Sequence, residues 1–130
     1  MKTSTIGKLF SLASAATISS FGMWLINQEP AFALDITPSG WCTHTNSYIV
    51  FGDFDGSGNR DALCTDSEGG KWINFASGVK WSTQSSWCTH SGSRITSYDI
   101  NGDKRDDLAC KDTKGGYWER LAPKSGQFEF

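Results

Sequence analysis

From residue 34 to residue 130 the chain lacks three patterns that would point to common classes of protein. No segment carries apolar residues at the 3.6-residue spacing of an amphipathic helix, so strands and turns are the expected elements. No stripe of Lys and Arg is present, which argues against nucleic acid as a partner. No nucleophile or carboxylate stands beside His44 or His90 in a recognisable catalytic pattern. The expectation is an all-β, non-catalytic protein.

The first 33 residues have the features of a secretory signal peptide. Lys2 and Lys8 give a basic start, residues 9–26 are mostly apolar or small, and Ala31-Phe32-Ala33 fits the small-x-small cleavage pattern. We expect cleavage before Leu34, no membrane span after cleavage, and secretion to an extracellular or periplasmic compartment. An uncleaved membrane anchor is the alternative, but five serine and threonine residues interrupt the apolar run.

The mature chain would span residues 34–130, and its 97 residues suit one small domain whose core needs help from cross-links or metal. All four cysteines lie in this part, and an even number in a short exported chain predicts two disulfides. A structural zinc site needs closely spaced ligand pairs, whereas Cys42 and Cys64 are 22 residues apart. We therefore expect disulfides.

An internal repeat with a period of 46 residues is the strongest feature of the sequence. Residues 41–76 align with residues 87–122 without a gap and give 15 identities at 36 positions. We place repeat 1 at about residues 41–86 and repeat 2 at about residues 87–130. The pairing of Cys42 with Cys64 and of Cys88 with Cys110 gives each repeat the same internal bridge, although spacing alone leaves a pairing between repeats open.

Each repeat is expected to form short strands separated by turns. The expected strands, rich in β-branched and aromatic residues, are residues 47–53, 61–66 and 71–76 in repeat 1 and residues 93–99, 107–112 and 117–122 in repeat 2. Residues 79–81, between the repeats, are a further candidate strand. Asp66 and Asp112 precede Gly-Gly pairs and are expected to be turn residues.

Two nine-residue acidic loops, residues 53–61 and 99–107, follow the first expected strand of each repeat. Each has short oxygen-bearing side chains at its first, third, fifth and ninth positions, a spacing that can wrap oxygen ligands around a hard cation such as calcium. The glycine at the fourth position, Gly56 or Gly102, allows the sharp turn. Seven of the 13 carboxylates of the mature chain lie in these loops, and this density of negative charge favours a bound cation.

The flanks of the loops distinguish between families that bind calcium. EF-hands need a Glu at the twelfth position and a helix on each side, and dockerins need a helix after each loop, but here the twelfth position is Cys64 or Cys110. Residues 52–62 and 98–108 resemble instead the FG-GAP or VCBS repeat of integrin-type β-propellers, whose pattern is Gly-Asp-Phe-Asn-Gly-Asp-Gly-x-x-Asp-Leu.

This resemblance implies two tandem antiparallel β-blades of the β-propeller type, each with one calcium-type loop. It implies ligation by the side chains at loop positions one, three, five and nine and by the backbone carbonyl at position seven. The candidate ligands are Asp53, Asp55, Ser57, Asn59 and Asp61 in the first loop and Asp99, Asn101, Asp103, Arg105 and Asp107 in the second. Asn59 and Arg105 would contribute backbone oxygen alone.

Three departures from the family pattern affect this interpretation. Ser57 replaces an aspartate, and Lys104 replaces a glycine and brings a cation next to the second loop. The alternative is that one or both loops are metal-free turns closed by Asp and Asn side chains. Two repeats are also too few to close a ring of about four to eight blades. We prefer a compact two-blade form to a self-assembling unit or a truncated relative of a longer protein.

The mature chain has five tryptophans, and exposed tryptophans stack on sugar rings, so glycan binding is one hypothesis. Trp41 and Trp72 have repeat equivalents in Trp87 and Trp118, which favours a packing role for these four. Trp81 has no equivalent and is the weak candidate for a ligand contact.

We interpret the chain as a secreted, calcium-binding, non-catalytic repeat protein that acts as an extracellular binding or adhesion module for a glycan or a protein. A purely structural repeat unit that assembles with itself or with a larger propeller protein is the alternative. An exported hydrolase is a third class. His44 and His90 are expected to bond within their own turns, and a cavity joining either to a carboxylate would favour the hydrolase.

Overall fold

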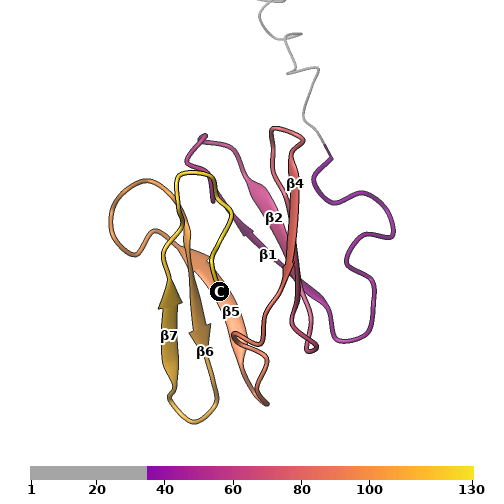
Figure 1. The fold of residues 1–130 in the computed structure, drawn as a ribbon, viewed down its shortest axis with the longest axis vertical. Helices are drawn as coiled ribbons and strands as arrows, with labels where there is room; N and C mark the ends of the chain where they lie inside the picture. The colour runs from indigo at the N-terminus through magenta and orange to yellow at the C-terminus, as the bar shows by residue number, and fades with distance from the viewer. Residues whose placement is uncertain (1–34) are drawn as a thin grey trace, which may run out of the picture. The chain divides into compact units, whose positions relative to one another are not determined.

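A computed structural model describes residues 35–130, which form seven strands in two antiparallel sheets (Figure 1). The signal peptide expected over residues 1–33 lies outside the described residues. The strands are β1 (Tyr48–Gly52), β2 (Asp61–Thr65), β3 (Gly70–Asn74), β4 (Lys80–Gln84), β5 (Arg94–Tyr98), β6 (Asp107–Lys111) and β7 (Tyr117–Arg120). All regular elements in this part of the chain are strands, so the all-β prediction is confirmed.

Each repeat forms its own sheet. Sheet 1 has the strand order β1-β2-β3-β4, and sheet 2 has the order β5-β6-β7. The predicted strands occur in the predicted order, and the candidate strand at residues 79–81 is the start of β4. Equivalent residues pair in equivalent ways, since Ile49 faces Cys64 in sheet 1 and Ile95 faces Cys110 in sheet 2. The repeat in the sequence is therefore a repeat of structure.

The turn between the second and third strands of each sheet explains the Gly-Gly pairs. Asp66 Oδ1 accepts hydrogen bonds from the N–H groups of Glu68 and Gly70, as expected of a turn residue. The indole of Trp72 lies over Gly70, where an added Cβ would be only 2.1 Å from the ring. The equivalent residues of repeat 2 are Asp112, Lys114, Gly116 and Trp118. The second glycine of each pair is thus required by the tryptophan that follows it.

Each sheet carries one disulfide, Cys42–Cys64 in repeat 1 and Cys88–Cys110 in repeat 2. The paired Cα atoms are 5.5 and 5.6 Å apart. This is the predicted pairing, and the alternative pairing between repeats is excluded. Each bridge closes a loop of about 23 residues and contributes on the order of 3 kcal/mol when chain entropy dominates. The bridges fasten the segment before each sheet to the second strand of that sheet.

The sheets differ in size because the chain leaves them in different directions. After β3, a hydrogen bond from the Phe75 N–H to the Val79 carbonyl closes a hairpin that leads into β4. After β7, a turn at Pro123 leads the chain back toward the sheets, where it ends (Figure 1). The Phe128 side chain in this segment is 2% exposed and belongs to the core. Within residues 35–130, no strand pairs with the outer edge of β7.

The two sheets contribute opposite faces to one common core. Sheet 1 contributes Val50, Leu63 and Ile73. Sheet 2 contributes Ile95, Leu108 and Cys110, whose repeat equivalents in sheet 1 are Ile49, Ala62 and Cys64. These equivalents lie on the other face of sheet 1, because side chains alternate between the faces of a strand. The two repeats therefore stand front to back.

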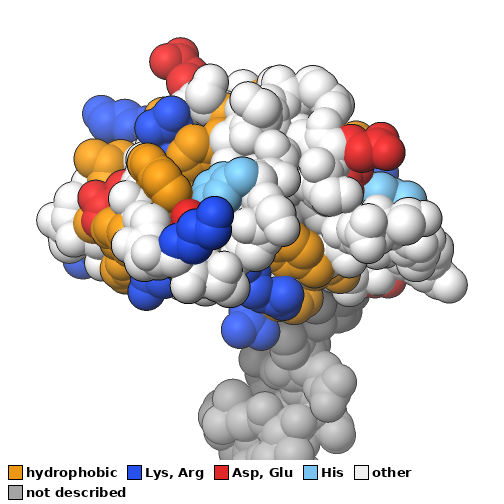
Figure 2. All heavy atoms as spheres, turned by 90° about the horizontal axis from the view of Figure 1, so that it is seen from below, with side chains coloured by type: hydrophobic (Ala, Val, Ile, Leu, Met, Phe, Trp, Pro, Cys, Tyr) orange, Lys and Arg blue, Asp and Glu red, His pale blue; other side chains and the backbone are white. Residues whose placement is uncertain are grey.

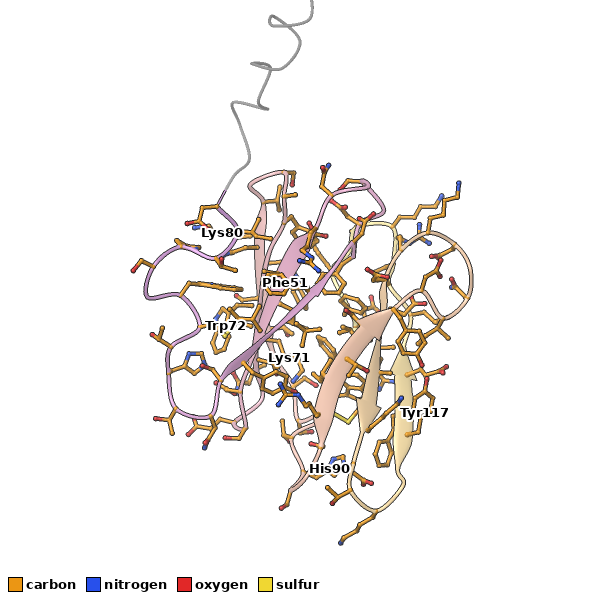
Figure 3. The ribbon with its side chains drawn as sticks, turned by 180° about the vertical axis from the view of Figure 1, so that it is seen from behind. Phe51, Lys71, Trp72, Lys80, His90 and Tyr117 are labelled. Atoms are coloured by element: carbon orange, nitrogen blue, oxygen red, sulfur yellow. A yellow bond between two sulfur atoms is a disulfide. The ribbon has the colours of Figure 1, made fainter. Side chains whose placement is uncertain are left out.

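The outer faces of the two sheets consequently differ in character. The exposed side chains on the outer face of sheet 2 are Arg94, Thr96, Tyr98, Lys111, Tyr117 and Glu119. Lys and Arg side chains are scattered among apolar and acidic ones on the side of the molecule seen in Figure 2. The outer face of sheet 1 retains Ile49, Phe51 and Trp72, and Figure 3 shows Trp72 and Tyr117 on different sheets. Sheet 1 therefore has the more apolar outer face.

Candidate metal centre

The first acidic loop brings three carboxylates together. Oxygen atoms of Asp53, Asp55 and Asp61 lie within 4.8 Å of one another. The Asp53 carboxylate accepts hydrogen bonds from the N–H groups of Ser57 at 2.9 Å and Gly58 at 2.8 Å. The positive φ of Gly58, 82°, allows this tight path. The loop therefore gathers its carboxylates through its own backbone.

Asp61 is the buried member of the cluster and connects the loop to sheet 1. Its side chain accepts hydrogen bonds from the Phe54 N–H at 2.9 Å and the Ala76 N–H at 2.8 Å. Burial raises the pKa of Asp61 above its ordinary value, and Asp55 and Asp53 add to the rise, although the two N–H groups oppose it. A cation beside the carboxylates would offset the cost of keeping this charge buried.

The donor set of the first loop fits a hard divalent cation. Calcium takes six to eight oxygen ligands, and this loop offers three carboxylates and the Ser57 hydroxyl. The Asn59 N–H donates to that hydroxyl at 3.4 Å. Of the five residues predicted for this loop, the structure gathers Asp53, Asp55 and Asp61 into one group that could hold a metal ion.

The second acidic loop has the same backbone frame without the same cluster. Its predicted ligands Asp99, Asp103 and Asp107 do not gather within 4.8 Å of one another as Asp53, Asp55 and Asp61 do. The Asp99 carboxylate accepts N–H groups from the loop, as Asp53 does. Asp107 accepts the N–H groups of Ile100 and Ala122, the repeat equivalents of the partners of Asp61. The Asn101 side chain accepts a hydrogen bond from the Asp103 N–H. Both loops thus contain the Asp and Asn turn bonds that a metal-free loop would use.

The Arg105 guanidinium supplies positive charge inside the second loop. Its Nη2 is 2.5 Å from Asp103 Oδ2, and its Nε donates to the Ala122 carbonyl at 3.2 Å. The Arg105 N–H also donates to Asp103 Oδ1 at 2.9 Å. This backbone hydrogen bond, with the guanidinium charge, lowers the pKa of Asp103. The family resemblance implies a backbone role alone for Arg105 and does not predict its ion pair with Asp103.

Lys104 and its repeat equivalent Gly58 have the same left-handed backbone conformation, with φ of 69° and 82°. Glycine adopts this conformation freely, whereas lysine does not. A non-glycine residue in the left-handed region costs about 1–2 kcal/mol. The second loop therefore carries backbone strain that the first loop avoids.

The two loops are joined through Asp53 and Asp106. The Asp53 N–H donates to Asp106 Oδ2, and the Asp106 N–H donates to the Asp53 carbonyl, both at 2.8 Å. Asp106 aligns with Arg60 in repeat 1, so this link has no counterpart in the first loop. The repeat pattern does not predict this role of Asp106 in fixing the start of the first loop.

The carbonyl groups of His44 and His90 accept hydrogen bonds within their own turns, as predicted, but the two imidazoles bond outside those turns. His44 Nε2 lies 2.9 Å from Asp66 Oδ2, and His90 Nε2 lies 3.2 Å from Asp112 Oδ2. Each imidazole also packs edge-on against the tryptophan of its sheet, with ring centroids 5.0 Å apart. Burial opposes ionisation of Asp66, but hydrogen bonds from Gly70, Glu68 and His44 outweigh it and lower the pKa. In each sheet, the histidine therefore lies between the aspartate and the tryptophan of the turn that joins the second and third strands.

A polar hollow of about 200 Å³ lies between the repeats, and Asp66 and His90 both line it. Ser67, Ser91 and Ser93 line the same hollow. Ser93 Oγ donates to the His90 carbonyl rather than to its ring. Among residues 35–130, no hydroxyl or thiol is hydrogen-bonded to either imidazole. The His–Asp pairs therefore have no nucleophile within hydrogen-bond reach in this part of the chain.

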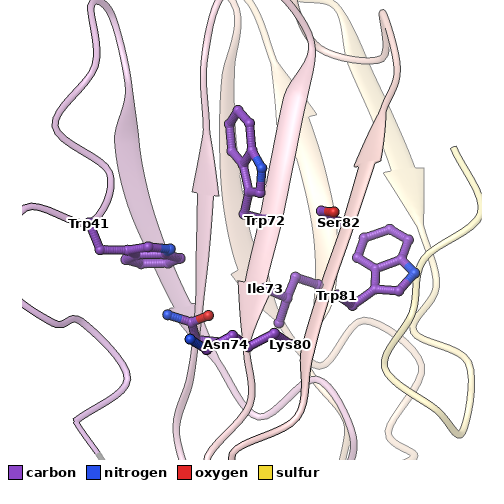
Figure 4. Close-up of a pocket in the computed structure, with 7 residues that line it drawn as sticks. All are labelled: Trp41, Trp72, Ile73, Asn74, Lys80, Trp81 and Ser82. Carbon is purple, nitrogen blue, oxygen red and sulfur yellow. The ribbon is translucent and has the colours of Figure 1, made fainter.

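A groove of about 280 Å³ lies on the outer face of sheet 1 (Figure 4). Its lining residues are Trp41, Trp72, Ile73, Asn74, Lys80, Trp81 and Ser82. Trp72 and Ser82 are partners across β3 and β4 and share the outer face, whereas Ile73 and Trp81 share the core face. Trp81, the predicted ligand contact, borders the groove from the core side, with its ring centroid 6.3 Å from that of Phe130.

The four repeat-equivalent tryptophans do not share one environment. Trp87 packs against the core, as predicted. Trp118, for which packing was also predicted, is 44% exposed. Trp41 and Trp72 are half-buried and line the groove. A shared position in the repeat therefore does not give a shared degree of burial.

Comparison with protein-family models, curated proteins and solved structures gave no match. The structure shows two small antiparallel sheets, each with a disulfide, and an aspartate cluster able to hold a metal ion. The two disulfides indicate an oxidising environment of the extracellular type. Residues 35–130 contain no helix long and apolar enough to cross a membrane.

Proposed function

We propose that the chain is a secreted, calcium-binding, non-catalytic repeat protein that acts as an extracellular binding module. The observation that carries this proposal is the convergence of Asp53, Asp55 and Asp61 within 4.8 Å. Carboxylates this close repel one another, and a divalent cation between them replaces repulsion with attraction. Calcium matches the oxygen donors of the loop.

Asp61 links the proposed calcium site to the rest of sheet 1. Its carboxylate holds the Phe54 N–H in the loop and the Ala76 N–H just beyond the end of β3. β3 carries Trp72 and Asn74, which line the groove on the outer face. Calcium in the first loop would therefore stabilise the strand that supports the groove, which makes ligand binding dependent on calcium.

The two repeats are proposed to be blades of the FG-GAP or VCBS type. Their front-to-back packing supports this, because repetition about an axis places the front of one unit on the back of the next. The charged and polar outer face of sheet 2 suits a terminal unit, since end repeats need a polar outer surface. This favours a compact two-blade protein over head-to-tail assembly with further copies.

Thermal unfolding of the exported protein with calcium and with chelator tests the calcium proposal. Calcium at 100 times its dissociation constant should stabilise the fold by about 2.7 kcal/mol per site. Asp55→Asn keeps an acceptor for the Ser57 N–H and removes one charge, so it should lose most of this gain. The matched control Asn101→Ala changes the same position of the second loop and should keep the gain at the first. Superimposable melting curves for the unmodified protein would rule out the proposal.

A glycan array probed with and without calcium separates a binding module from a purely structural unit. The binding module predicts retention on a defined set of glycans in calcium and loss of that retention in chelator. A structural unit predicts no retention in either condition.

An exported hydrolase is the second candidate, because Asp66 and His90 line one polar hollow. Nitrophenyl esters and nitrophenyl glycosides are suitable general substrates for a test. The binding module predicts no turnover above the buffer blank. Turnover that His90→Ala abolishes, while His44→Ala retains it, would favour the hydrolase.

A further inference from the structure

We propose that the groove on the outer face of sheet 1 is a carbohydrate site that takes one pyranose ring between Trp41 and Trp72. This inference rests on the proposed binding function and gives it a location and a ligand class. The groove holds about 280 Å³, just below the range of about 300–1,000 Å³ found for small-molecule sites. That volume suits one sugar ring and its linkages.

Repeat 2 contains an internal comparison for the groove. Trp87 is the repeat equivalent of Trp41, and the Phe130 ring lies on it with centroids 5.4 Å apart and planes inclined by 35°. The Arg120 guanidinium carbon is 5.7 Å from the Trp87 ring centroid. Arg120 is the repeat equivalent of Asn74, which lines the groove with Trp41. In repeat 2, the Trp87 indole is thus covered by the six-membered ring of Phe130 and lies beside the polar side chain of Arg120.

The corresponding indole in repeat 1, that of Trp41, is not covered by any aromatic ring of the described residues. Trp72 contacts His44 edge-on, and it lies on the outer face of β3 with Ser82 beside it on β4 (Figure 4). Two half-buried indoles from different segments therefore border one open groove.

The polar groups of the groove select a sugar over an apolar ring. Ser82 and Lys80 line it, and within residues 35–130 neither side chain makes a hydrogen bond or an ion pair. The Asn74 amide donates to the Ile36 carbonyl at 2.9 Å, which leaves its own carbonyl oxygen as an acceptor. A phenyl group would leave these polar atoms unpaired. A pyranose offers an apolar C–H face to the indoles and hydroxyls to the polar rim, and the Lys80 ammonium favours a ring that bears a carboxylate.

A second copy of the chain fits the groove less well. The strand residues with which sheet 1 covers the equivalent face of sheet 2 are the aliphatic Val50, Leu63 and Ile73. The repeat equivalents of these residues on the outer face of sheet 2 are Thr96, Ala109 and Glu119. Packing this face of a second copy onto the groove would bury charge and hydroxyl groups that the aliphatic surface does not have.

Titration with two matched probes, in excess calcium, tests the assignment. Cellotetraose is neutral, and the tetraglucuronate of the same linkage differs in carrying carboxylates. The indole N–H signals in nuclear magnetic resonance spectra of the exported protein report each tryptophan separately. We expect both probes to shift the signals of Trp41 and Trp72 and to leave those of Trp87 and Trp118 unchanged.

Four variants of the exported protein make the test specific. Trp72→Ala should weaken binding of both probes at least tenfold. The matched control Trp118→Ala removes the equivalent indole and its histidine contact from sheet 2 and should leave affinity unchanged. Ser82→Arg fills the groove without removing an aromatic ring and should also abolish binding. Lys80→Gln should remove a preference of about fivefold for the tetraglucuronate, the size expected of one exposed ion pair.

Calorimetry with calcium on the same samples keeps the two proposals distinguishable. A protein that binds calcium but does not bind either probe at about 10 mM overturns the groove assignment and leaves the calcium proposal standing. Binding that Ser82→Arg does not change, or shifts confined to other tryptophans, also overturns it. So does a dimer in sedimentation that Trp72→Ala dissociates, because the groove would then be the contact between copies.

Discussion

The two acidic loops share one backbone frame and differ in their charge balance. In each, the aspartates at positions one and nine accept N–H groups from the loop and from the segment after the third strand. In the first loop, three carboxylates converge within 4.8 Å. In the second, the Arg105 guanidinium is paired with Asp103 at 2.5 Å. The backbone conformation of such a loop and the positive charge that neutralises it are therefore determined by different loop positions.

This difference depends on position seven, where Asn59 stands in one loop and Arg105 in the other. A side chain at this position is not needed for the frame, because the bonds that close the loop come from other residues. A long cationic side chain can nevertheless reach back to the carboxylate at position five. We infer that the first loop depends on an external cation and that the second is partly neutralised by its own arginine.

The largest expected effect comes from removing the buried aspartate of each loop. Asp61→Ala and Asp107→Ala each leave two N–H groups without their acceptor, so each should lower the free energy of unfolding in chelator by about 2–4 kcal/mol. In calcium, Asp61→Ala should lose the added stability and Asp107→Ala should keep it. Urea unfolding in both conditions measures this. Equal losses in calcium would erase the proposed difference between the loops.

Exchange of position seven should reverse part of the difference. Arg105→Asn frees Asp103 and should strengthen calcium binding at the second loop by about tenfold, equivalent to about 1.4 kcal/mol. Asn59→Arg places the guanidinium in the first loop and should weaken binding there by a similar factor. Calcium competition with a fluorescent chelator measures both. A pair of variants with unchanged affinities would show that Arg105 does not compete with the cation.

Position six should give a smaller effect on stability. Lys104 has a φ of 69°, so Lys104→Gly should relieve about 1 kcal/mol of strain and raise the free energy of unfolding. The reverse change in the first loop, Gly58→Lys, should lower it by about the same amount. Urea unfolding in chelator separates this backbone effect from calcium binding. Stabilisation by both changes would contradict the strain assigned to Lys104.

The smallest expected effect is a dependence on pH that calcium removes. The pKa of Asp61 is raised by burial, so this carboxyl group stabilises the fold when it is protonated. In chelator, its contribution should be lost as the pH rises from below the ordinary value of 3.8 through the raised pKa. Asp61→Asn should not show this loss. Unfolding measured in chelator as the pH is raised from 3.8 would test it.

Much of the architecture follows from the 46-residue repeat. The repeat gives the strands, the disulfide pairing and the two loops, because local pattern and spacing determine them. The choice of opposite faces could not be predicted, since Leu63 and Cys64 are both buried and the alternation that marks a core face is lost. The return of residues 123–130 to the core was missed because they do not resemble residues 77–84, which form β4 and its turn.

The sequence predicts which loops form the candidate site, but it does not predict the ion pairs that the side chains make. The positions of Asp53, Asp55 and Asp61 follow from a nine-residue spacing. The reach of the Arg105 side chain depends on its rotamer, which the sequence does not record. The His–Asp pairs join residues 22 positions apart, and the disulfide in each repeat was the sequence signal that could have placed them together.

Calorimetric titration of the protein with calcium tests the central claim most directly. The account predicts one tighter site per chain that Asp55→Asn abolishes, with binding at the second loop weaker and strengthened by Arg105→Asn. A titration without heat at millimolar calcium, or binding that Asp55→Asn and Asp61→Asn leave intact, would contradict it.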